Sequence, residues 1–212
     1  QVLYNIVGEP AVTGETTFTD LTANWYKDAV LWAYQTGVTS GTSETTFSPN
    51  DPVTREQAAV LLMGYAEKIA QVDLSGAQAD LSRFPDGDKV SAWARTQMSA
   101  AVALGLISGV PIDGRDYLCP QDSATREQVA TILYEYAAFK GCDMNVYGDL
   151  STFADMGKVS DFAKEPMTWA VAESLISGVA VGREALLDPQ GVTTREQFAM
   201  MMAEYMMQVL PL

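Results

Sequence analysis

The sequence predicts an all-α fold built from three helix–loop–helix repeats. The first observation is the tetrapeptide Thr-Arg-Glu-Gln, which occurs three times, at residues 54–57, 125–128 and 194–197. The second is periodicity, because apolar side chains recur at helical spacing on both sides of each loop. The third is that one such helical pair cannot bury its own apolar stripe, so we expect the three pairs to pack together.

Other positions repeat in register with the tetrapeptide. Each repeat has a Phe-x-Asp start, an aromatic residue in the first helix, a Ser-Gly pair, a proline before the tetrapeptide and a tyrosine ten residues after its arginine. The matched sets are Phe18, Phe84 and Phe153; Asp20, Asp86 and Asp155; Trp25, Trp93 and Phe162; Gly41, Gly109 and Gly178; Pro49, Pro120 and Pro189; Tyr65, Tyr136 and Tyr205.

The first helix of each repeat is amphipathic, and in copy one it is expected over residues 25–35. Gly37 and Gly105 end this helix in copies one and two, and Ser174 takes that position in copy three. Pro166 falls where copy three should be helical, so we expect it in a first turn or at a kink. The second helix opens at the tetrapeptide. In copy three it includes the methionine-rich residues 200–207. Their helical spacing favours core packing, and an adaptable docking surface is the alternative.

The repeats divide the whole chain. We expect a lead-in at residues 1–17, repeats at 18–72, 84–140 and 153–212, and linkers at 73–83 and 141–152. Because the chain opens with Gln1 and has no charged segment before an apolar one, we expect a processed product or an excised part of a longer protein.

Composition excludes several classes of function. The chain has 212 residues, 48% of them apolar, which suffices for a packed core. Its 27 acidic and 13 basic side chains give a net charge of −14, which disfavours nucleic acids and anionic membranes as partners. It contains no histidine, so Ser-His-Asp and Cys-His catalysis are excluded. No pair of carboxylates stands at a special spacing, and we expect no enzymatic activity.

We expect no membrane helix, disulfide, metal or cofactor. No apolar run approaches the roughly 20 residues that span a bilayer. Cys119 and Cys142 flank a predicted helix of about 15 residues, whose ends lie roughly 22 Å apart, so both are expected to be free thiols. A stretch resembling a calcium loop starts at Asp143, but Ala154 stands where the bidentate glutamate belongs.

The tetrapeptide predicts a helix start. Threonine followed three residues later by glutamine forms a capping box. Arginine at the first helical position opposes the helix dipole, so its recurrence at positions 55, 126 and 195 needs an explanation. One alternative is an ion pair with a loop carboxylate, such as Asp51, Asp122 or Asp188. The other is an anion site that combines the guanidinium with the helix-end N–H groups.

Together these motifs resemble the S-layer homology domain, a family whose repeats combine the same landmarks with a Thr-Arg-Ala-Glu-type box. The resemblance covers roughly residues 18 to 209. It implies a pseudo-threefold helical bundle with three prongs, which anchors secreted proteins non-covalently to the wall of Gram-positive-type bacteria. The implied partner is an anionic secondary cell-wall polysaccharide, often pyruvylated, held in grooves between prongs. This chain departs from the family in three respects. Glutamine stands at the usual glutamate of the box, the loop that follows the Ser-Gly pair is rewritten in all three copies, and Phe162 takes the tryptophan position of copy three.

The resemblance also implies a set of binding residues. In this family the arginine of the Thr-Arg-Ala-Glu-type box is the residue most closely tied to polymer binding. The resemblance therefore implies this role for the arginines of the three tetrapeptides, called the box arginines below. For Trp25 and Trp93, stacking on a sugar and packing in the core stay open as alternatives. The early aspartates are expected to shape a turn or a helix start, or to accept a hydrogen bond from a sugar. The implied ligand-binding set is Arg55, Arg126, Arg195, Gln57, Gln128, Gln197, Trp25, Trp93, Asp20, Asp86, Asp155, Gly41, Gly109 and Gly178.

We therefore expect a non-catalytic cell-surface anchor that captures an acidic glycan, with several grooves adding avidity. Replacement of the three box arginines by alanine is expected to leave the helical fold intact and to abolish wall binding. The alternative function is a protein–protein module that assembles with copies of itself or with other surface proteins in a lattice.

Overall fold

The computed structural model describes residues 17–22, 27, 30, 31, 34, 35, 37 and 40–208. Residues 1–16 of the predicted lead-in, Trp25 and most of the helix expected at 25–35 lie outside these residues. The described positions Lys27, Val30 and Tyr34 are helical.

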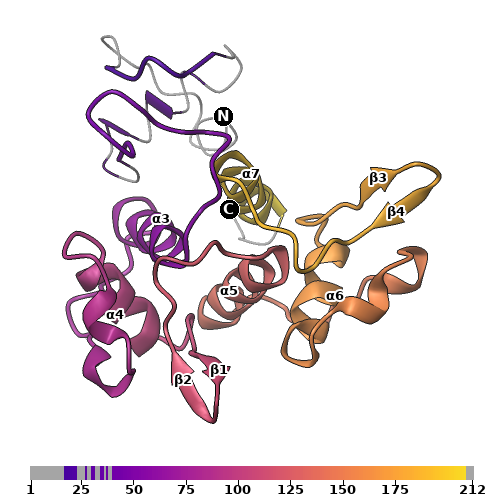
Figure 1. Ribbon diagram of the computed structural model, residues 1–212. Helices are drawn as coiled ribbons and strands as arrows, with labels where there is room; N and C mark the ends of the chain where they lie inside the picture. The colour runs from indigo at the N-terminus through magenta and orange to yellow at the C-terminus, as the bar shows by residue number, and fades with distance from the viewer. Residues whose placement is uncertain are drawn as a thin grey trace.

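Three long helices begin at the three tetrapeptides, as the sequence predicts. They are α3 (Arg55–Lys68), α5 (Arg126–Phe139) and α7 (Arg195–Gln208). Figure 1 shows them gathered around a common centre, with the shorter helices α4 (Arg95–Ala103) and α6 (Lys164–Ala172) outside them. Helix α4 packs against α3, and α6 packs against α5. Each short helix is therefore covered by the long helix of the preceding repeat.

The expectation of an all-α fold is incomplete, because each of the second and third repeats contains a small antiparallel hairpin. Strand β1 (Val110–Ile112) pairs with β2 (Arg115–Tyr117), and β3 (Val179–Val181) pairs with β4 (Glu184–Leu186). Both hairpins project from the helical body (Figure 1). Their turns contain Asp113-Gly114 and Gly182-Arg183, and the backbone of Asp113, Gly114 and Gly182 adopts positive φ, which suits a tight turn.

The segments expected as linkers contain short 3₁₀ helices. These are Leu81–Arg83 and Leu150–Thr152, followed inside the repeats by Gly87–Lys89, Met156–Lys158 and Asp161–Ala163. Leu74, Ala77 and Ala79 pack against the core. The segment at 73–83 therefore contributes to the packed body.

The short helices α4 and α6 end at the positions that the sequence predicts. Gly105 follows α4 with φ +75°, and Ser174 follows α6 with φ +59°. Both residues occupy the left-handed region, which glycine enters without strain and serine does not. Pro166 is the third residue of α6, so the prediction of a first-turn proline is confirmed.

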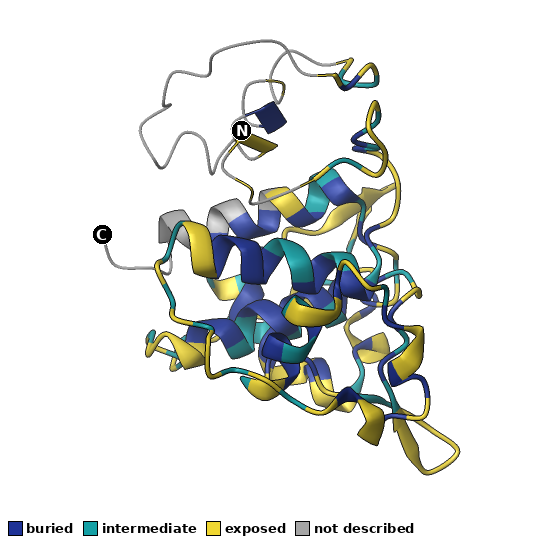
Figure 2. Ribbon diagram, turned by 90° about the vertical axis from the view of Figure 1, so that its left-hand side faces the viewer, coloured by how far each residue is buried: buried dark blue, intermediate teal, exposed yellow. Residues whose placement is uncertain are grey.

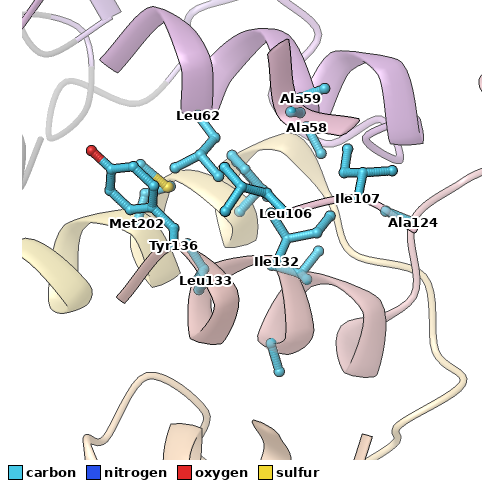
Figure 3. Close-up of a cluster of buried hydrophobic side chains, with 14 of the residues drawn as sticks. Ala58, Ala59, Leu62, Leu106, Ile107, Ala124, Ile132, Leu133, Tyr136 and Met202 are labelled. Atoms are coloured by element: carbon cyan, nitrogen blue, oxygen red, sulfur yellow. The ribbon is translucent and has the colours of Figure 1, made fainter. Parts of the chain in front are cut away.

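One hydrophobic cluster joins all three repeats. Leu62 of α3, Tyr136 of α5 and Met202 of α7 meet in it (Figure 3), and buried residues concentrate where the helices face one another (Figure 2). The ring of Tyr136 meets that of Tyr65 edge-on and that of Tyr205 at a tilt, with ring centroids 6.3 and 5.8 Å apart. Met201 and Met202 are buried, which confirms core packing for these two methionines.

Both cysteines are free thiols, as predicted. No helix among the described residues is long and apolar enough to cross a membrane.

Three backbone hydrogen bonds close a cycle through the repeats. The N–H of Val53 donates to Thr193 O at 2.8 Å, that of Thr193 to Ala124 O at 2.9 Å, and that of Ala124 to Val53 O at 2.8 Å. All three residues have no exposed surface. The segment before each long helix therefore bonds the matching segments of the other two repeats.

Candidate functional site

All three tetrapeptides form the predicted capping box. The N–H groups of Gln57, Gln128 and Gln197 donate to the threonine hydroxyls at 3.3, 3.3 and 3.2 Å. In return, the glutamine Oε1 atoms accept from the threonine N–H groups at 3.1 to 3.2 Å. The three glutamines are thus used in starting the helices.

The next helix-end N–H groups are bonded to a neighbouring repeat. Arg55 N donates to Asp122 O and Glu56 N to Pro120 O, both at 3.0 Å. The second repeat makes the same pair of bonds to residues 191 and 189 of the third, and the third repeat makes them to residues 51 and 49 of the first. These groups are therefore not free to hold an anion, and that alternative of the sequence analysis does not apply to them.

The box arginines clamp one repeat to the next. Arg55 donates from Nε to Leu118 O at 2.8 Å and from Nη2 to Ser108 O at 3.1 Å. Arg126 bonds Leu187 O and Ser177 O at 2.9 and 3.2 Å. Arg195 bonds Phe47 O and Ser40 O at 2.9 and 3.4 Å. All three side chains are buried, and each guanidinium bonds one buried carbonyl group and one carbonyl group of an exposed serine.

Carboxylates act on these arginines only from a distance. In the part of the chain that the structure describes, none of the three forms an ion pair. Burial lowers the pKa of Arg55, and the charges of Cys119, Asp122 and Asp86 oppose this shift. Burial likewise lowers the pKa of Arg126 and Arg195, against nearby aspartates. The ion-pair alternative is thus replaced by carbonyl bonding, with the acidic loop residues supplying a favourable field.

The early aspartates hold the same loops from their other side. Asp86 accepts from the N–H groups of Leu118 and Cys119, both at 2.8 Å. Asp155 accepts from Leu187 and Asp188 at 2.7 and 2.9 Å, and Asp20 accepts from Phe47 and Ser48. The second residue of each pair has positive φ. The carboxylates therefore stabilise a strained turn, which agrees with the turn role expected of them.

Glycines allow the loops to pack tightly. A Cβ added at Gly109 would overlap the side chain of Asp116, and one added at Gly178 would overlap the ring of Phe153. At Gly41 it would overlap the ring of Phe18 and backbone oxygens. A side chain at these positions would displace the loop that carries the Ser-Gly pair.

The aromatic residues matched to the family tryptophan lie on the surface. Trp93 is 55% exposed and Phe162 is 58% exposed. Core packing is therefore wrong for Trp93, because its position precedes α4 and faces outward. Trp169, which no sequence argument selected, is the tryptophan found fully buried in the described residues.

A groove of about 300 Å³ brings several of these residues together. Its lining includes Arg55 from the first repeat, Ser108, Gly109, Gln128 and Glu135 from the second, and Phe162 from the third. Burial raises the pKa of Glu135, and the charge of Glu165 raises it further. The groove thus combines an exposed aromatic face, a buried cation and a carboxyl group that ionises less readily than usual.

Sequence reasoning missed the role of the box glutamates. Glu56 accepts from the N–H and hydroxyl of Ser91 at 2.9 and 2.8 Å and from Gln121 at 2.9 Å. Glu127 makes the matching bonds to Ser160 and Gln190. The signal was present, since Ser91 and Ser160 recur two residues before Trp93 and Phe162. These bonds place each exposed aromatic residue relative to the preceding repeat.

The family model for the S-layer homology domain matches the chain three times, at residues 17–59, 83–130 and 152–199. These matches contain the described residues of the groove except Thr131, Ile132 and Glu135.

Several curated proteins are similar to parts of the chain. A surface-layer 125 kDa protein of Lysinibacillus sphaericus is 36% identical over 120 residues, 56% of this chain and 10% of the relative. An amylopullulanase of Thermoanaerobacterium thermosulfurigenes is 31% identical over 118 residues, 55% of this chain and 6% of the relative. A cell surface protein of Thermoanaerobacter kivui is 30% identical over 148 residues, 68% of this chain and 18% of the relative. The matched regions are small parts of all three relatives.

Proposed function

This chain belongs to the S-layer homology domain family, and we propose that it is a non-catalytic module that anchors a secreted protein to a bacterial cell wall. Its ligand is an anionic secondary cell-wall polysaccharide, bound in grooves between repeats. The relatives support a surface location, because two of them are named as surface proteins. The similar amylopullulanase shares only 6% of its length with this chain, which fits an anchoring part joined to a separate catalytic part.

The observation that carries the proposal is the groove that the second repeat forms with Arg55 of the first repeat and Phe162 of the third. Phe162 offers an exposed apolar face there, on which the C–H face of a sugar ring packs. Arg55 supplies positive charge at the same groove. An acidic substituent on the sugar is attracted to this charge, and burial strengthens the attraction by excluding water.

In this mechanism the box arginine has two tasks. Its Nε and Nη2 atoms hold the loop that forms one groove wall, through Leu118 O and Ser108 O. A guanidinium has five N–H donors, so this clamp leaves donors for a ligand. Arg55 is thus both a positioning residue for the wall of the groove and a contact for the acidic group.

The repeat pattern supports two further grooves and a pseudo-threefold arrangement. Trp93 holds the position of Phe162 one repeat earlier, and Arg195 clamps the first repeat as Arg55 clamps the second. We therefore assign Trp93 and Arg195 to an equivalent groove between the first two repeats. Trp25 and Arg126 correspond to a third. Simultaneous occupation of two grooves by one polymer increases avidity without new contacts.

The net charge of −14 opposes an anionic ligand at long range. Physiological salt screens such repulsion beyond roughly 8 Å, so contacts inside the groove decide affinity. Affinity for the glycan therefore depends more on the aromatic face and the buried arginine than on the net charge of the protein. It further assigns pyruvyl groups as the acidic substituents, by the family resemblance.

The test compares aromatic variants for binding to purified Gram-positive cell-wall sacculi by co-sedimentation. Phe162→Ala and Trp93→Ala each remove one stacking face, and the double variant should lose most binding, about tenfold or more. Tyr147→Ala is the matched control, because Tyr147 is 64% exposed and is not part of the groove. Full binding by the double variant, with its far-ultraviolet circular dichroism unchanged, would overturn the groove as the site.

A second candidate function is assembly with copies of itself in a surface layer. The hairpins favour it, because Ile112 is 42% exposed, Val179 43% and Val181 55%. These side chains give the hairpins exposed apolar surface that a second copy of the protein can cover. Concentration-dependent association in analytical ultracentrifugation, in the absence of any glycan, would support this function.

A further inference from the structure

We propose a second anion-binding subsite on the second repeat, built from Arg83 and Arg115, which holds another acidic group of the same glycan. This inference rests on the proposed function, because it takes an acidic polysaccharide as the ligand. Two adjacent guanidinium groups recognise carboxylate and phosphate groups alike.

The subsite is a depression of about 630 Å³ beside the loop of the second repeat. Its lining includes Arg83 and Phe84, from the start of the repeat, and Arg115 and Asp116, from strand β2. Elements that are 32 residues apart in sequence, at positions 83 and 115, thus place two cations around one hollow.

Both arginines are available to a ligand. Arg83 and Arg115 are exposed, and neither forms an ion pair within the described part of the chain. The guanidinium of Arg83 lies 4.7 Å from the centre of the Phe84 ring, a cation–π contact that restrains its position. Asp80 attracts Arg83 through space, and Asp116 lines the same hollow. These two carboxylates reduce the local positive charge and leave both guanidinium groups unpaired.

The depression adjoins the groove of the proposed function. Ser108 and Gly109 line both hollows. The carbonyl of Ser108 is held by Arg55 at 3.1 Å, so the dividing wall is fixed in place. A glycan that leaves the groove beside Phe162 can therefore cross this wall and enter the depression between Arg83 and Arg115.

The other two repeats lack this pair of cations. Counted from the matched landmarks, position 83 corresponds to Thr17 in the first repeat and Thr152 in the third. Position 115 corresponds to Glu44 and Glu184. The second repeat thus carries two positive charges where each of the others carries one negative charge. This difference predicts that acidic chains extend outward from the groove on the second repeat and not on the others.

The test uses the double variant Arg83→Thr/Arg115→Glu, which gives the second repeat the residues of the third. The matched control is Lys68→Glu/Lys140→Thr, which changes the net charge equally at two exposed helix ends. The probe is the polysaccharide released by acid from sacculi of the source organism, used at full length and as short fragments of one or two sugars. Isothermal titration calorimetry measures affinity for each protein.

We expect the double variant to bind the full-length polysaccharide about tenfold more weakly than the control variant, a loss typical of one good charged contact. Short fragments, which fill the groove alone, should bind both proteins equally. Carboxyl-reduced and dephosphorylated polysaccharide distinguish the two chemistries, because the difference between the proteins disappears when the recognised group is removed.

Equal affinity of the double variant and the control for the full-length polysaccharide would overturn the subsite. If Phe162→Ala still weakens binding in that case, the groove stands and only the subsite is refuted. Failure of the unmodified protein to bind the polysaccharide at all would refute both proposals.

Discussion

Arg195, near the end of the chain, donates from Nε to the carbonyl oxygen of Phe47, near its beginning, at 2.9 Å. Its guanidinium carbon also lies 4.7 Å from the centre of the Phe47 ring. The two residues are 148 positions apart. This contact completes a cycle in which Arg55 clamps the second repeat, Arg126 the third and Arg195 the first.

Because of this cycle, the three repeats differ from a linear repeat array. In a linear repeat array each unit contacts only its neighbours, and the terminal units are less supported. Here the last repeat bonds the first through Arg195 and through the backbone of Thr193 and Val53. We therefore expect the three repeats to unfold together, and the grooves between them to depend on all three.

The first prediction concerns the arginine clamp. Arg126→Ala removes the donors to Leu187 O and Ser177 O and leaves both carbonyls without these partners. We expect the free energy of unfolding to fall by about 2–4 kcal/mol, measured by urea denaturation. This replaces the sequence-based expectation that alanine at the box arginines leaves the fold untouched. The control is Arg183→Ala, at an exposed hairpin turn, and an equally small loss in both variants would contradict the clamp.

The second prediction concerns the end of α6. Ser174 has φ +59°, in the region where Gly105 closes α4 with φ +75°. Ser174→Gly should stabilise the protein by about 0.5–1 kcal/mol, because relief of the strain exceeds the added entropy of the unfolded chain. Gly105→Ala should destabilise it by a similar amount. Thermal unfolding followed by calorimetry measures both, and destabilisation by Ser174→Gly would refute this account of the helix end.

The third prediction concerns acid unfolding. Partial burial raises the pKa of Asp20, and the N–H groups of Phe47 and Ser48 lower it more, so its net pKa lies below 3.8. A carboxyl group with a depressed pKa stabilises the fold above its unfolded value and ceases to do so as pH falls through its folded value. Asp20→Asn should therefore be less stable than the unmodified protein at pH 7, and this difference should shrink as the pH is lowered from 7 to 2. A constant difference across that range, in urea denaturation at each pH, would exclude this role.

The fourth prediction concerns the carboxyl group in the groove. Burial and then the charge of Glu165 raise the pKa of Glu135, and its ionised form repels an acidic ligand. Glu135→Gln should bind the wall polysaccharide about three- to tenfold more tightly at pH 7. Binding by the unmodified protein should strengthen as pH falls through the raised pKa of Glu135, and the variant should lose this dependence. Titrations from pH 4 to 7 measure it; weaker binding by the variant would show that Glu135 contacts the ligand favourably.

Much of the fold could be predicted because its signals are local. The capping boxes at Thr54, Thr125 and Thr194 set the helix starts through residues three positions apart. The first-turn position of Pro166 follows from its missing N–H. The hairpins were missed because their strands have three residues each, too short for an alternating pattern to register.

The site was harder to predict, because its residues interact across repeats. A box arginine opposed to its own helix dipole is explained only by carbonyls of the next repeat, 51 to 155 residues away in sequence. For Trp93 the sequence left core packing and sugar stacking open, and only the structure places it outside α4, in the turn held by Glu56 and Ser91. Spacing along the chain identifies such residues and does not specify which repeat they contact.

The measurement that tests the central claim most directly is co-sedimentation of the unmodified protein with Gram-positive sacculi from the source organism. One sample keeps its secondary polysaccharide, and the other has been stripped of it by acid. The account predicts binding to intact walls and none to stripped walls. Equal binding to both, or binding to neither, would contradict it and favour the assembly function that the exposed hairpins support.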